Sequence, residues 1–196
     1  MRRVTDAIAD DRLVWIDLEM TGLEIDRDVI VEIACIVTDS DLVELDDGIQ
    51  LIVHADAGSL AQMGDYVREM HTKSGLLPEI ERSDVTVAAA QQAVLEYVKT
   101  HVKTPGSAPL CGNSIGTDRR FLAQYMRELD DYLHYRSIDV SSLKELCKRW
   151  YPAAYKKRPN KSEHHRALDD IRESIEELRF YRETLLRPPD PSEPPS

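Results

Sequence analysis

The order of extended and helical segments restricts what this chain can fold into more than any other feature of its sequence. Apolar, β-prone runs come first, at residues 13–16, 29–37 and 49–53, and the short polar connections between them favour an antiparallel meander. Helical repeats of apolar residues then alternate with two further short strands, at residues 109–112 and 137–140. We therefore expect the α/β class, with a mixed five-stranded sheet flanked by helices.

Four helices are expected between and after the later strands. Their apolar residues recur every three or four positions, which places them on one face of a helix. The last of these repeats is the strongest amphipathic stripe in the chain. The expected helices cover residues 85–102, 121–129, 143–150 and 168–178.

The length of 196 residues is that of about one domain with a single core. We expect one globular domain over residues 1–187. The remaining segment, residues 188–196, holds five of the ten prolines in the chain. Proline removes backbone donors and blocks regular structure, so this tail is expected to be disordered.

The net charge of −11 at pH 7 limits the partners of this chain. A protein that holds long nucleic acid through counterion release needs a basic surface, so no long duplex partner is expected. A nucleic-acid substrate should therefore be short. Acidic residues at a metal site do not exclude phosphates, because the metal ions neutralise them.

Cysteine usage and hydropathy point to the cytoplasm. The three cysteines, Cys35, Cys111 and Cys147, are odd in number and lack Cys-x-x-Cys spacing, so we expect reduced structural thiols. No segment reaches the apolar length of a membrane span, and the first residues lack the apolar core of a signal peptide. We expect a cytoplasmic protein without a membrane partner.

Asp17 and Glu19 close the first apolar run, with one residue between them. Side chains two residues apart on a strand point to the same face, so both carboxylates can bind one metal cluster. The alternative is a solvated strand end. The apolar run directly before the pair favours the metal site, because carboxylates beside a sheet core are costly without a cation.

Asp118 follows the fourth strand and a turn of small residues, residues 112–116. At the start of a helix, an aspartate can instead cap the helix or stabilise its dipole. The small residues nearby allow a substrate backbone to approach closely, which favours a functional site.

His165 and Asp170 form a third segment, but His164 and Asp169 have the same five-residue spacing. Asp170 lies nearer than Asp169 to the apolar stripe of the last helix, so periodicity favours Asp170. Five helical residues turn through about 500°, so the histidine is expected on the loop before the helix. Together, four carboxylates and one imidazole are typical of a two-metal phosphodiesterase, with two Mg²⁺-class ions and a histidine base.

Four motifs give the chain a close resemblance to the oligoribonucleases, within the DEDDh group of 3′→5′ exonucleases. The motifs are WIDLEMTGL at residues 15–23, CGNSIGTDRRF at 111–121, DVSSLKEL at 139–146 and HRALDDIRES at 165–174. The resemblance implies a ribonuclease-H-like fold, a homodimer, and Mg²⁺ or Mn²⁺ as cofactor. It also implies degradation of short RNA of 2–5 nucleotides, including 5′-phosphorylated diribonucleotides, to mononucleotides. The family pattern places the histidine on His165 and the last aspartate on Asp170.

The same resemblance implies a set of substrate contacts. Leu23 and an aromatic residue separate and stack the two bases; the aromatic residue is usually tryptophan in bacterial relatives, whereas this chain has Tyr66. Tyr135 corresponds to a residue that completes the site of the neighbouring subunit. The remaining positions that contact substrate or cap its 5′ phosphate are His71, Ser114, Arg136, Ser141 and Ser142.

Two alternatives remain open from the sequence. A proofreading-type DNA exonuclease would share the same metal ligands, and the 2′-hydroxyl of the substrate would distinguish it. A dinucleotide sensor or scaffold on the same fold would not need all four carboxylates, Asp17, Glu19, Asp118 and Asp170. Their joint presence favours an enzyme.

Overall fold

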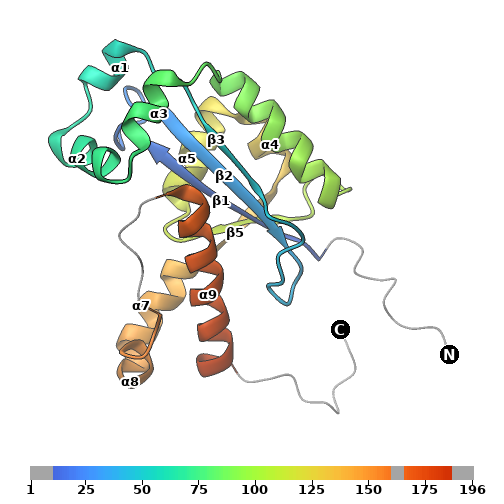
Figure 1. The fold of residues 1–196 in the computed structure, drawn as a ribbon. Coiled ribbons are helices and arrows are strands. Elements are labelled where there is room, and N and C mark those ends of the chain that lie inside the picture. Colours follow the sequence, from blue (N-terminus) through green and yellow to red (C-terminus); the bar gives the residue numbers. More distant parts are fainter. Residues whose placement is uncertain (1–10, 160–165, 187–196) are drawn as a thin grey trace.

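The computed structural model describes residues 11–159 and 166–186. Its centre is one five-stranded sheet in the spatial order β3-β2-β1-β4-β5 (Figure 1). The first three strands pair antiparallel, and β4 and β5 run parallel to β1. The strands are β1 (Leu13–Met20), β2 (Ile30–Thr38), β3 (Ile49–Ile52), β4 (Pro109–Gly112) and β5 (His134–Asp139). The expected mixed five-stranded α/β sheet is confirmed.

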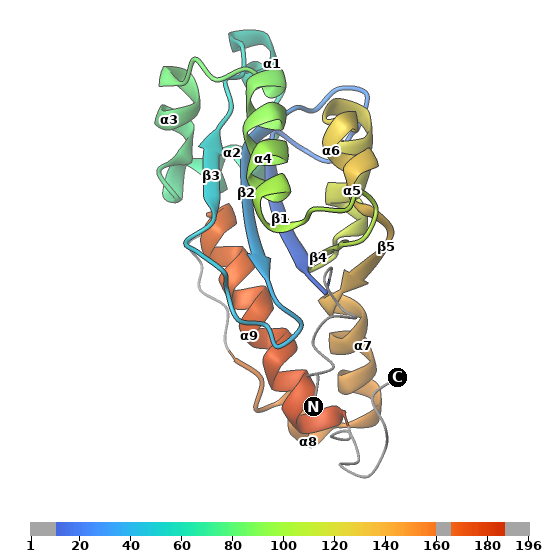
Figure 2. The same ribbon diagram turned by 90° about the vertical axis from the view of Figure 1, so that its right-hand side faces the viewer.

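Helices cover both faces of the sheet. The helices are α1 (Ala57–Ala61), α2 (Asp65–Lys73), α3 (Leu76–Arg82), α4 (Val87–His101), α5 (Gly116–Tyr125), α6 (Arg127–Tyr132), α7 (Val140–Trp150), α8 (Pro152–Tyr155) and α9 (Ala167–Leu185). One apolar core contains residues of α4, α5 and α6, and a second contains residues of α7 and α9. Figures 1 and 2 show α4 and α9 on opposite sides of the sheet.

Alternation along β1 decides which side chains face each layer of helices. Val14, Ile16 and Leu18 belong to the core beneath α4 and α5, whereas Trp15 packs in the core beneath α9. Because successive side chains of a strand point to opposite faces, Asp17 and Glu19 lie on the α9 side. The two-residue spacing therefore directs both carboxylates toward the last helix.

Three features differ from the sequence-based expectation. Helices α1 to α3 occupy residues 57–82, a segment for which no helix is expected; they pack around Val31 and Ile80 in a third, smaller core. The single helix expected over residues 121–129 is broken at Met126, whose φ of −134° and ψ of 52° are not helical. The fifth strand begins earlier, at His134, and α7 begins at Val140.

The proline-rich segment, residues 188–196, lies outside the described residues, so its disorder stays a prediction. The single-domain boundary at residue 187 stays a prediction as well. In the two described ranges, none of the helices combines the length and apolar character needed to cross a bilayer.

Candidate active site

Three carboxylates meet where β1 passes beneath the start of α9. Asp17, Glu19 and Asp170 each offer an oxygen, and these oxygens all lie within 4.8 Å of one another. Asp169, the alternative in sequence, is exposed. Asp170 belongs to the first turn of α9, where its backbone N–H donates to the carbonyl of Arg166 at 3.0 Å.

Asp118 approaches the same strand from α5. Its Oδ1 accepts a hydrogen bond from the backbone N–H of Leu18 at 3.1 Å. Strand β4 pairs with β1 only at Val14 and Trp15, so the edge of β1 beyond them is open to this side chain. Asp118 lies outside the 4.8 Å group formed by the described residues, although its charge is close enough to raise the pKa of Glu19.

The buried carboxylates disfavour one another's charge. Burial is the main cause that raises the pKa of Glu19 to about 8, followed by the charges of Asp170, Glu32 and Asp118. Burial likewise raises the pKa of Asp118 to about 7. A cluster of acids that resists ionisation near neutral pH is a favourable place for a divalent cation, which would relieve both the repulsion and the desolvation. The donor set of hard carboxylate oxygens therefore fits Mg²⁺ or Mn²⁺.

Glu32 and Arg166 extend this centre, and sequence reasoning missed both. Glu32 lies opposite Glu19 in the antiparallel register of β1 and β2 and is fully buried. Its Oε1 lies 3.2 Å from Nε of Arg166, whose Nη2 lies 2.9 Å from Oε2 of Glu79 on α3. An acidic residue within the mostly apolar β2 run was the available sequence signal.

The expected base, His165, lies outside the described residues, as does the alternative His164. The assignment of the base therefore stays a prediction. The described chain resumes at Arg166, which directly precedes α9.

The turn after β1 presents Leu23 to solvent. Asp28 organises this turn, since its carboxylate accepts hydrogen bonds from the hydroxyl of Thr21 at 3.3 Å and from the backbone N–H of Glu24 at 2.8 Å. A Cβ on Gly22 would lie 2.3 Å from Oδ2 of Asp28, so only glycine fits this position. Leu23 is 65% exposed, which leaves its side chain available to a ligand.

The two expected contacts on α2 have opposite environments. Tyr66 is 77% exposed in the first turn. His71 is fully buried, with Nε2 2.9 Å from the carbonyl oxygen of Met20 and Nδ1 3.9 Å from Oε2 of Glu19. His71 therefore packs against the carboxylate cluster, with its imidazole on the buried side of Glu19.

Ser114 and Ser141 are in direct contact, with 3.1 Å between their hydroxyl oxygens. The backbone N–H groups of both residues donate to Oδ1 of Asp139 at 2.9 Å, so this aspartate caps α7 and ties it to the loop after β4. Ser114 has a left-handed backbone, with φ of 53°, and the hydrogen bonds offset the strain of that conformation. Ser142 is exposed beside them.

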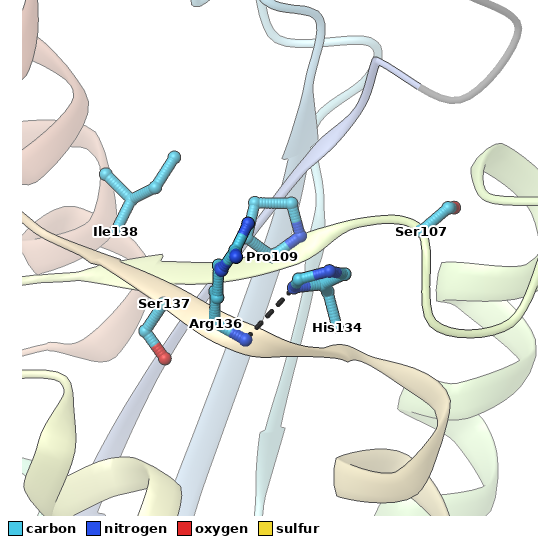
Figure 3. A pocket seen from close by; sticks show the side chains of 6 residues that line it. All are labelled: Ser107, Pro109, His134, Arg136, Ser137 and Ile138. Carbon is cyan, nitrogen blue, oxygen red and sulfur yellow. Dashed lines mark hydrogen bonds between the residues drawn. The ribbon is translucent and has the colours of Figure 1, made fainter.

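Tyr135 and Arg136 project from the edge strand β5. The register between β4 and β5 shifts between Pro109 and Leu110, which leaves these two residues outside the ladder. Arg136 contacts the ring of Tyr135, with 5.2 Å from Cζ to the ring centroid, and its backbone N–H donates to Nδ1 of His134 (Figure 3). Arg136 borders a cavity of about 270 Å³, which is lined by Ser107, Pro109, His134, Arg136, Ser137 and Ile138.

The structure thus places the expected residues in two groups. Asp17, Glu19 and Asp170 form the carboxylate cluster. Asp118 and His71 lie next to it, and each contacts the backbone of β1. Ser114 and Ser141 form a second group at the start of α7. Arg136 stands three residues before the end of β5, and its described contacts are with its neighbours on that strand.

Known proteins similar to this chain are exonucleases. The RNase_T family model, described as Exonuclease, matches residues 14–178. The oligoribonuclease of Mycobacterium avium is 56% identical over 183 residues, which cover 93% of this chain and 85% of the relative. The oligoribonuclease of Nocardia farcinica is 54% identical over 94% of this chain and 86% of its own length. The oligoribonuclease of Rhodococcus jostii is 56% identical over 93% and 92%, respectively.

Solved structures show the same fold at low sequence identity. A zinc-bound complex of Escherichia coli exonuclease I with single-stranded DNA has a TM-score of 0.68 at 14% identity and covers 90% of this chain. Exonuclease I from Methylocaldum szegediense has a TM-score of 0.62 at 18% identity and covers 89%. In both comparisons the chain spans 41% of the larger protein.

Proposed function

The chain belongs to the oligoribonuclease family of exonucleases, and from this premise we propose that it hydrolyses 5′-phosphorylated diribonucleotides at a two-metal centre. It is a 3′→5′ exoribonuclease that degrades oligoribonucleotides. The observation that carries the proposed centre is the convergence of Asp17, Glu19 and Asp170 within 4.8 Å.

The carboxylates and the histidines have different roles in the proposed site. Asp17, Glu19, Asp118 and Asp170 would hold two Mg²⁺ or Mn²⁺ ions. When bound, such ions lower the pKa of water and stabilise the developing negative charge on the leaving 3′ oxygen. His165 accepts the proton of the attacking water. His71 packs beside Glu19 on the buried side, where its Nδ1 lies 3.9 Å from Oε2 of Glu19.

Substrate contacts surround the cluster. Leu23 and Tyr66 are exposed apolar side chains that would pack against bases. Ser114, Ser141 and Ser142 would donate to a terminal 5′ phosphate, and the guanidinium of Arg136 is suited to the same group. A cap on the 5′ phosphate would favour the shortest substrates within RNA of 2–5 nucleotides. His71, being fully buried, would act on substrate through Glu19.

A homodimer would complete the site. Tyr135 is 74% exposed on an edge strand and lacks a ladder partner, so its ring is available to a neighbouring subunit. We place the enzyme in the cytoplasm.

Turnover of a 5′-phosphorylated diribonucleotide, with and without EDTA, tests the proposal. We expect the activity to vanish with EDTA and to return with Mg²⁺ or Mn²⁺. Asp170→Asn should abolish turnover, whereas the matched variant Asp169→Asn, at the exposed neighbour, should retain it. Equal loss in both variants, or turnover that survives EDTA, would contradict the two-metal centre. Cleavage of the 2′-deoxy dinucleotide at the same rate would instead indicate a DNA exonuclease.

A further inference from the structure

Arg166 connects three parts of the fold at the edge of the proposed metal centre. Its Nε lies 3.2 Å from Oε1 of Glu32 on β2, and its Nη2 lies 2.9 Å from Oε2 of Glu79 on α3. Arg166 itself directly precedes α9. One guanidinium therefore joins the sheet, the α2–α3 unit and the helix that carries Asp170.

Glu32 accepts from several donors in a fully buried position. Its Oε1 also accepts from the side chain of Gln50 on β3. Its Oε2 lies 3.5 Å from the backbone N–H of Ala167, the first residue of α9. Glu32 therefore holds the N-terminus of α9 in two ways, through the Arg166 side chain and through the helix backbone.

One helical turn connects these contacts of Glu32 and Arg166, here called the Glu32–Arg166 clamp, to the metal ligands. The carbonyl of Arg166 accepts a hydrogen bond from the backbone N–H of Asp170 at 3.0 Å, so the position of Arg166 sets the position of the aspartate. Glu32, at the other end of the clamp, lies opposite Glu19 in the strand register. Any shift of α9 relative to β2 would thus change the distance between Asp170 and Glu19.

We infer that Arg166 is a positioning residue for the metal centre: its contacts with Glu32 and Glu79 hold the start of α9 so that Asp170 stays within reach of Asp17 and Glu19. This inference rests on the proposed metal site. The alternative role is charge compensation alone, in which Arg166 only offsets the surrounding acids. The two roles predict opposite changes in metal affinity, because a nearby cation repels a divalent ion, whereas a misplaced ligand weakens binding.

Mn²⁺ binding to the substrate-free protein, measured by isothermal titration calorimetry, distinguishes the two roles. We expect Arg166→Met and Arg166→Lys both to weaken Mn²⁺ binding by about tenfold or more, because lysine keeps the charge but not the fork that reaches two carboxylates. The matched control is Arg172→Met on the same helix, whose Nε lies 3.4 Å from Oε2 of Glu44 in the connection between β2 and β3. It should bind Mn²⁺ as the wild type does.

Measurements of Tm provide a separate control for effects on folding. Arg166→Met leaves the buried Glu32 without its guanidinium, so its metal-free Tm should fall, and the double variant Arg166→Met with Glu32→Gln should recover much of that Tm. The Mn²⁺ affinity of the double variant should stay low. Wild-type affinity in Arg166→Lys, unchanged or tighter affinity in Arg166→Met, or full recovery of affinity in the double variant would each overturn the positioning role. Failure of the wild type itself to bind Mn²⁺ would instead overturn the proposed metal site.

Discussion

The backbone N–H of Leu18 donates to Oδ1 of Asp118 across 3.1 Å, which ties the first turn of α5 to the open edge of β1. The same carboxyl group is an expected metal ligand. Asp118 therefore accepts a structural hydrogen bond and is also expected to bind metal, and substitutions can separate these two roles.

We expect Asp118→Asn to keep the fold while abolishing metal binding, because an amide oxygen still accepts from Leu18 but lacks the negative charge. Asp118→Ala should lose metal binding and also about 1–3 kcal/mol of unfolding free energy, since the buried N–H of Leu18 loses its acceptor. Urea denaturation of the metal-free variants measures the difference. Equal stability of the two variants would show that the hydrogen bond contributes little.

Metal binding should release protons near neutral pH. Glu19, with a pKa raised to about 8 by burial and neighbouring acids, is mostly protonated at pH 7 in the absence of metal, and a metal ligand must be ionised. Apparent Mg²⁺ affinity should therefore rise with pH up to about 8 and then level off. Calorimetry in two buffers of different ionisation enthalpy counts the protons released. Affinity that is independent of pH would contradict this assignment.

The stability of the metal-free protein should depend on pH in the opposite direction. Because the folded-state pKa of Glu19 is raised from 4.5 to about 8, its protonated form stabilises the fold at low pH, and this contribution is lost as pH rises through about 8. Tm should fall between about pH 5 and about pH 9. Glu19→Gln should flatten this decline, whereas Asp169→Asn, at an exposed position, should leave its slope unchanged.

His165→Ala should lower kcat by about 10²–10⁴, because imidazole supplies proton transfer, while Mg²⁺ affinity persists. His164→Ala is the matched control and should have a mild effect. Single-turnover rates at saturating metal provide the measurement. The reverse ranking of the two variants would move the base to His164.

Substrate length should decide the efficiency of cleavage. A cap on the 5′ phosphate leaves no room for further nucleotides, so kcat/KM should be highest for the 5′-phosphorylated dinucleotide and decline for tetramers and octamers at fixed salt. Arg136→Ala should hurt the dinucleotide most, by about 1.5–3 kcal/mol, the contribution of a hydrogen bond to a charged group.

The control for that length series is Arg127→Ala, an exposed arginine that pairs with Asp131 within α6. It should leave the ranking of substrates unchanged. Values of kcat/KM that are equal across lengths, or that rise with length, would indicate an open groove. Arg136 would then not cap the 5′ phosphate.

Local patterns in the sequence were sufficient for the framework of the site. The alternation of β1 puts Asp17 and Glu19 on one face, because side-chain direction in a strand depends only on the period of two. The apolar stripe of the last helix likewise favours Asp170 over Asp169. Such features need no knowledge of distant residues, since they follow from the geometry of one element.

Contacts between distant segments were decided only by the tertiary structure. No local pattern links Glu32, Glu79 and Arg166, because their meeting depends on how β2, α3 and α9 pack. The break at Met126 likewise interrupts a continuous apolar repeat, and Met126 is itself buried in the core with Phe121 and Leu129. The sequence alone determined which residues could form a metal centre. Packing of α9 on the sheet determined which carboxylates meet. Their burial and mutual repulsion depend on the distances between them, and only the folded chain defines those distances.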